Sequence, residues 1–88
     1  MFDTNTSEYR SEYAKQAPLM RAKWRDASPS AAAWAHADVL ETIQIAESDY
    51  RDPRQPGAYS AAYVAKLYAE LDALRDRRAA IAKAGGAA

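Results

Sequence analysis

His36 is the single histidine of this chain, and it is the first residue to weigh for catalysis or metal binding. A catalytic histidine needs a nucleophile or an acid within hydrogen-bond reach, and the sequence offers no recognisable combination of that kind. The chain has no second histidine to complete a metal-binding pair, and no cysteine to act as a thiolate ligand or nucleophile. We therefore interpret His36 as a partly buried structural residue bonded to a backbone or hydroxyl group. No catalytic residue, bound metal or cofactor is predicted.

Two pairs of acidic residues have helical spacing, Asp38 with Glu41 and Asp72 with Asp76. A pair of carboxyl groups can serve as general acid and base, but at i, i+3 or i, i+4 spacing it usually forms a solvated helix face. We expect the surface role for both pairs, and so a protein that is not an enzyme.

Basic residues gather in two places, near Trp24 (Arg21, Lys23, Arg25) and near the end of the chain (Arg75, Arg77, Arg78, Lys83). Such clusters can hold the phosphates of nucleic acid. Acidic residues are interleaved with both clusters, however, and the 12 basic residues of the chain are balanced by 12 acidic ones. A nucleic-acid-associated protein that uses Arg75, Arg77 and Arg78 therefore remains an alternative. The simpler interpretation is pairing of these basic residues with an acidic helix of the same chain.

Hydrophobic periodicity predicts an all-α fold in a single domain over residues 1–88, with helices at about 6–27, 29–51 and 58–84. Pro18 predicts a kink or a break in the first helix, and we favour the break, which would give four helices. Glu8 is expected to complete a capping box with Asn5 or Thr6, Ser28 is expected to cap the second helix, and Gly85 or Gly86 to end the third in a left-handed conformation. Short connections favour antiparallel neighbours in a compact three-helix bundle.

The helix at 29–51 is predicted to be the central one, because it has apolar residues on two sides. One stripe faces the core: Ala32, His36, Val39, Leu40, Ile43, Ala46 and Tyr50. Trp34 and Ile45 project from the opposite side together with Asp38 and Glu41. Either the other two helices cover both sides, or both pack on the Val39 side and leave an acidic-rimmed apolar patch for another protein. This helix contains acids but no Lys or Arg from Pro29 to Tyr50.

The remaining predicted core residues lie in the last helix, where Val64, Leu67, Leu71, Leu74 and Ile81 recur at helical spacing. Most of the six tyrosines are expected at the edge of this core. Tyr59 and Tyr68 lie furthest from the stripe and are secondary candidates for partner contact.

Composition and length set the remaining limits. A chain of 88 residues in which Ala supplies 22 of the 43 hydrophobic residues has a small core and little room for a deep cleft. The N-terminus lacks the layout of a signal peptide, and no apolar run approaches the roughly 20 residues that cross a bilayer. We expect a soluble, cytoplasmic protein without a membrane partner.

These observations favour a stoichiometric protein-interaction module that binds a larger protein, with Trp34, Asp38, Glu41 and Ile45 as the contact residues. The acidic helix indicates a partner surface rich in Lys and Arg, of the kind that receives nucleic acid. In size and Ala-rich helical composition the chain is similar to small phage-encoded accessory proteins, including anti-CRISPR inhibitors of host defence and small virion adaptors. That similarity rests on no motif. A self-assembling structural protein with Tyr68 and Leu71 near the contact is the further alternative, and a homo-oligomer stays open.

Overall fold

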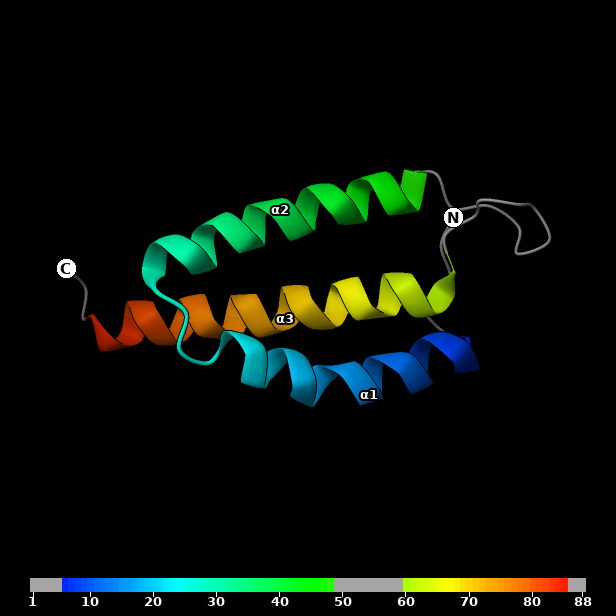
Figure 1. Ribbon diagram of the computed structural model, residues 1–88, viewed down its shortest axis with the longest axis horizontal. Helices are drawn as coiled ribbons and strands as arrows, with labels where there is room; N and C mark the ends of the chain where they lie inside the picture. The colour runs from blue at the N-terminus through cyan, green and yellow to red at the C-terminus, as the bar shows by residue number, and fades with distance from the viewer. Residues whose placement is uncertain (1–5, 49–59, 86–88) are drawn as a thin grey trace.

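The computed structural model describes residues 6–48 and 60–85, and these form three α-helices. They are α1 (Ser7–Trp24), α2 (Pro29–Ser48) and α3 (Ala61–Ala84), and the described residues include no strand. Consecutive helices run in opposite directions, so that α1 and α3 point the same way (Figure 1). The all-α bundle with antiparallel consecutive helices is confirmed.

The central helix is α3, whereas the sequence pattern had predicted α2. Both α1 and α2 pack along α3 and make at most slight contact with each other (Figure 1). The prediction was wrong because α2 buries only one side, while α3 buries two.

One side of α3 carries the large aliphatic residues and faces α2. Val64, Leu67, Leu71 and Leu74 are buried there, in one cluster with three residues of α2: Val39, Ile43 and Ala46. Spacing in the sequence predicted both of these stripes correctly. Ile81, at the end of the α3 stripe, is only partly buried, and Tyr50 lies outside the described residues.

The other buried side of α3 is made of alanines and faces α1. Ala69 and Ala73 form a second cluster with the buried Met20, and Tyr13 and Trp24 of α1 pack against it. Small side chains let two helix backbones approach closely, so α1 can dock along this stripe without large residues on α3. This face was not predicted, because alanine is frequent in α3 at exposed positions such as Ala79 and Ala80 as well as at buried ones.

Pro18 does not break α1, which continues as one helix from Ser7 to Trp24. A proline inside a helix costs about 3 kcal/mol relative to alanine. Contacts on both sides of Pro18 act against a break, because Tyr13 before it and Met20 after it both pack on α3. The predicted break, and with it a fourth helix, is wrong.

Side chains cap the beginning of all three helices. Thr6, Ser28 and Ser60 accept hydrogen bonds from the backbone N–H groups of Tyr9 (3.2 Å), Ala31 (3.2 Å) and Tyr63 (3.1 Å) respectively. The predicted Ser28 cap is therefore confirmed, and the third helix begins at Ala61 rather than at 58.

Two other predicted end signals differ from the structure at the residues that it describes. With Thr6 as the cap, the residue that would reach back is Tyr9, so Glu8 cannot complete a capping box. Its carboxylate instead accepts from the N–H of Ala62 at 3.1 Å and joins α1 to the first turn of α3. Gly85 ends α3 in the right-handed region (φ −74°), not in a left-handed conformation, and donates its N–H to the Ile81 carbonyl at 2.9 Å. Gly86, the other predicted position, lies outside the described residues.

Candidate functional site

The outer face of α2, formed by Trp34, Asp38, Glu41 and Ile45, is not covered by the described part of the chain. Trp34 is 77% exposed and Ile45 is 48% exposed, although both are large and hydrophobic. Val39 and Ile43, on the opposite side of the same helix, are buried against α3. The arrangement in which a helix packs on each side of α2 is therefore wrong. The alternative holds only in part, because α3 covers the Val39 side while α1 packs along α3 rather than on α2.

The four residues of the outer face lie in one row. Steps of four, three and four residues keep side chains within about 60° of one another around a helix, and the row extends about 16 Å along the axis at 1.5 Å per residue. Trp34 and Ile45 stand at the two ends of the row, and the two acids lie between them. This is an apolar strip with a negatively charged middle.

The carboxylates of Asp38 and Glu41 are exposed and have neither a hydrogen bond nor an ion pair within the described residues. The side-chain hydrogen bond that reaches Asp38 ends on its backbone carbonyl, which accepts from the hydroxyl of Thr42 at 2.9 Å. Among the described acids of α2, Glu47 is the one whose side chain is bonded to another helix, through the hydroxyl of Tyr68 at 2.8 Å. Both central charges of the outer face are therefore available to a partner.

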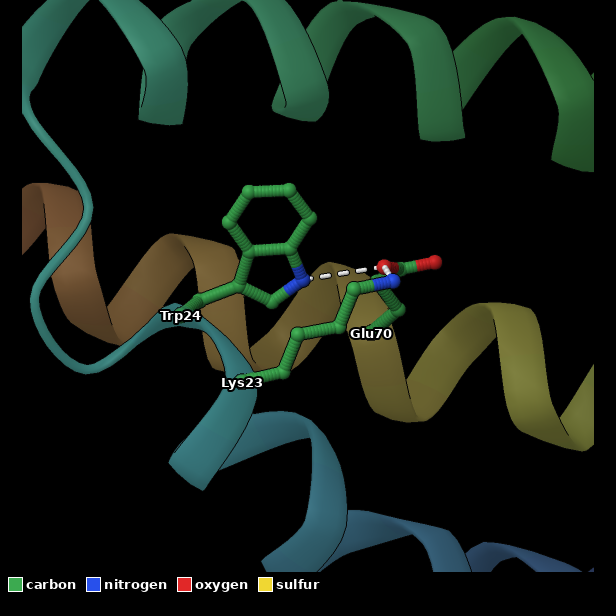
Figure 2. A network of polar contacts seen from close by, with 3 residues as sticks. All are labelled: Lys23, Trp24 and Glu70. Atoms are coloured by element: carbon green, nitrogen blue, oxygen red, sulfur yellow. Dashed lines mark hydrogen bonds and ion pairs between the residues drawn. The ribbon is translucent and has the colours of Figure 1, made fainter.

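The expected pairing of basic residues with the acids of α2 is not present in residues 6–48 and 60–85. The ion pair found there joins α1 to α3, between Lys23 and Glu70 at 3.0 Å. The indole Nε1 of Trp24 donates to the same carboxylate oxygen at 2.9 Å, and Figure 2 shows the two donors meeting on it. Glu70 is largely shielded from solvent, which makes this junction a fixed point between the two helices.

His36 lies at the edge of the contact between α2 and α3, where its Nδ1 is 3.2 Å from a guanidinium nitrogen of Arg78. Arginine can only donate, so Nδ1 accepts and the ring is neutral. Burial, followed by the charges of Arg78 and Arg75, lowers the pKa of His36 below its usual value. The prediction that His36 bonds to a backbone or hydroxyl group was wrong. Its contact with Arg78 joins α2 to α3, which is a structural role.

The arginines named as nucleic-acid candidates have different environments. Arg77 donates from Nε to the carbonyl of Ala27 at 2.9 Å, which ties α3 to the loop between α1 and α2. Arg78 contacts His36, and Arg75 is exposed. Two of the three side chains are thus partly engaged within the molecule.

Tyr9, Tyr13 and Tyr68 lie at the edges of the core. Tyr68 is partly buried against the core cluster, with its ring 6.3 Å from that of Tyr9 and its hydroxyl bonded to Glu47. The hydroxyl of Tyr13 donates a hydrogen bond to Asp72. The Asp72 carboxylate is therefore bound to α1, rather than forming a pair of carboxyl groups with Asp76. Tyr59 lies outside the described residues, and Leu71 is buried, which leaves it unable to form a contact with another chain.

Within the described residues, no group of three or more His, Asp or Glu side chains is placed to hold a metal ion. None of the described helices is long and apolar enough to cross a membrane. Comparisons of the chain with protein-family models, with curated proteins and with solved structures give no match.

Proposed function

We propose that this protein is a non-enzymatic interaction module that binds a larger protein through the outer face of α2. The exposure of Trp34 carries the proposal. A tryptophan held 77% in solvent on a regular helix contributes nothing to the core of its own domain. Tryptophan is also, with tyrosine and arginine, enriched among the side chains that dominate binding energy in protein interfaces.

The partner that fits this face has a basic surface with an apolar depression. Asp38 and Glu41 are unpaired within the described residues, and α2 has no Lys or Arg from Pro29 to Ser48 to offset them. Complementary charge steers association and fixes orientation, while burial of the Trp34 and Ile45 side chains supplies affinity. A protein surface that normally receives nucleic acid has the required charge.

Inhibition by occupying such a surface is the activity that this arrangement supports best. The protein would then act stoichiometrically in the cytoplasm, or in the cytoplasm of a host cell if it is phage-encoded, in the manner of an anti-CRISPR protein. A small virion adaptor would use the same face to join two components of a particle.

The test compares Trp34→Ala with Leu19→Ala as the matched control. Leu19 is 57% exposed on α1, so both substitutions remove an exposed hydrophobic side chain, and only one of them changes the outer face of α2. A tagged wild-type protein is used to capture a partner from cell lysate, the partner is purified, and its affinity is measured by calorimetry. We expect Leu19→Ala to bind like wild type and Trp34→Ala to bind at least about 30-fold more weakly, the loss typical of a central interface residue.

Charge reversal gives the second arm of the same experiment. Asp38→Lys should slow association with the purified partner strongly, and Asp26→Lys, which reverses an exposed acid in the loop after α1, should change it little. Equal affinity of wild type and Trp34→Ala for every captured protein would refute the proposal.

Self-assembly through the same face is the second candidate, because two copies could cover each other's Trp34. Light scattering separates it from partner binding. A mass that rises with concentration in wild type and stays monomeric in Trp34→Ala would support self-assembly, whereas a monomer at all concentrations would exclude it.

A further inference from the structure

We infer that the hollow between the C-terminal parts of α1 and α3 is a binding site for a phosphate monoester. It has a volume of about 350 Å³ and is lined by Arg21, Trp24, Arg25, Ala73, Asp76, Arg77 and Ala80. The inference does not use the outer face of α2, so it can fail or succeed independently of the proposed function.

Three arginines line this hollow, two from the C-terminal end of α1 and its cap and one from α3. Arg21 lies in the last turn of α1, and Arg25 is the C-cap residue four positions later. Both are exposed and have neither a hydrogen bond nor an ion pair in the described part of the chain. Arg77 comes from α3 and is partly buried, and its bond to the Ala27 carbonyl holds the side chain while leaving both terminal nitrogens free to donate. The arginines thus form a partly preorganised set of donors.

The charge of the lining matches a phosphate rather than a carboxylate. Asp76 is the single acid among the lining residues, which leaves a net charge of +2 from three guanidinium groups and one carboxylate. A phosphate monoester carries about −1.5 to −2 at neutral pH and accepts bidentate bonds from arginine. A ligand with a single carboxylate would neutralise only half of the +2 charge of the lining.

The rest of the lining is apolar and indicates that the phosphate is attached to an organic group. Trp24, Ala73 and Ala80 supply this wall, and Trp24 is held in place by its bond to Glu70 (Figure 2). A volume of about 350 Å³ lies at the lower end of small-molecule sites and exceeds what a bare phosphate fills. A nucleoside monophosphate, with a planar base that can lie against an aromatic or guanidinium plane, fits this description.

The sequence could not show this site. Arg21 and Arg25 belong to one basic cluster of the sequence and Arg77 to the other, and only the docking of α1 on the alanine side of α3 brings them together.

The experiment is a calorimetric titration of the full chain at low salt with adenosine monophosphate, adenosine and inorganic phosphate. We expect the monophosphate to bind more tightly than either fragment. The double substitution Arg21→Gln/Arg25→Gln should weaken this binding by about tenfold or more, because it removes charge-assisted hydrogen bonds. The control Arg10→Gln/Lys15→Gln removes the same charge from exposed positions of α1 outside the hollow, and should bind like wild type.

A second titration distinguishes a free nucleotide from the end of a nucleic acid. Tighter binding of a 5′-phosphorylated oligonucleotide than of the same strand without the phosphate, lost in Arg21→Gln/Arg25→Gln, would assign the site to a strand end. Absence of binding by adenosine monophosphate and by the 5′-phosphorylated oligonucleotide, or equal binding of the monophosphate to the two double variants, would overturn the inference. Melting curves of both variants establish that each is folded.

Discussion

The two tryptophans of this chain have opposite environments, and the difference separates the part of the molecule that holds the fold from the part that is free to bind. Trp24 packs against both core clusters, and its indole N–H donates to Glu70 on α3. Trp34 lies on the outer face of α2, 77% exposed. A side chain of the same type therefore serves as an internal anchor in α1 and as an uncovered apolar surface in α2.

The same contrast extends to the charges around them. Next to Trp24, Lys23 lies 5.1 Å from the centre of the indole ring and pairs with Glu70. Next to Trp34 on the helix surface, the carboxylates of Asp38 and Glu41 have no partner in the described residues. Polar groups of the α1–α3 contact are used to join helices, whereas those of the outer face of α2 are left for solvent or for another molecule.

The largest change in the free energy of unfolding is expected from removing a core side chain of α3. Leu74→Ala deletes a fully buried side chain in the cluster shared by α2 and α3, and should lower the free energy of unfolding by about 2–5 kcal/mol. Ile45→Ala deletes an exposed side chain of similar size on the outer face, and should change it by less than about 1 kcal/mol. Urea unfolding monitored by circular dichroism measures both. A similar loss in the two variants would show that the outer face is covered.

The next largest difference in the free energy of unfolding is expected between alanine substitutions of the two tryptophans. Trp24→Ala removes packing from both clusters and a bond to Glu70, and should destabilise the protein by about 2–4 kcal/mol. Trp34→Ala should leave the free energy of unfolding within about 0.5 kcal/mol of wild type. The comparison uses the same urea unfolding experiment, and a larger loss for Trp34→Ala than for Trp24→Ala would reverse the assignment of core and surface.

The smallest expected effect on stability comes from the two tyrosine hydroxyls that join α3 to α1 and α2. It appears only at alkaline pH. The bond to Asp72, followed by burial, raises the pKa of Tyr13 to about 12. Burial, followed by the bond to Glu47, raises the pKa of Tyr68 to about 12. Because both pKa values lie above the 10.0 of an unperturbed tyrosine, the two bonds stabilise the fold fully below about pH 10 and are lost as the pH rises towards 12.

Melting temperatures across this range test the linkage. Wild type should lose stability between about pH 10 and pH 12 more steeply than the double variant Tyr13→Phe/Tyr68→Phe, which lacks both titrating hydroxyls. Curves of equal slope would mean that the two hydroxyl–carboxylate bonds do not persist in solution.

The sequence predicted those parts of the fold that depend on residues near one another in the chain. Ser28 followed by Pro29 marked the start of α2, and the spacing of Val39 and Ile43 marked its buried side. The leucines of α3 were found in the same way, because large aliphatic residues at helical spacing leave few alternatives.

Features that depend on docking between helices were not predictable in this way. Nothing in the local pattern separates the alanines of α3 that receive Met20 from the alanines that face solvent, so the central helix was misassigned. Glu8 caps a helix that begins more than 50 residues later, and His36 is bonded to Arg78 on another helix. The row of Trp34 to Ile45 was visible in the sequence, but whether it was covered depended on where α1 docked.

The most direct test of the account follows Trp34 itself while a partner binds. In the variant Trp24→Phe, Trp34 is the single tryptophan, and its fluorescence reports on the outer face of α2 alone. In the free protein we expect strong quenching by acrylamide and emission at long wavelength, and on saturation with the purified partner a blue shift with loss of quenching. Trp34 emission that stays fully quenchable in a complex shown by light scattering to be formed would contradict the claim that this face is the binding surface.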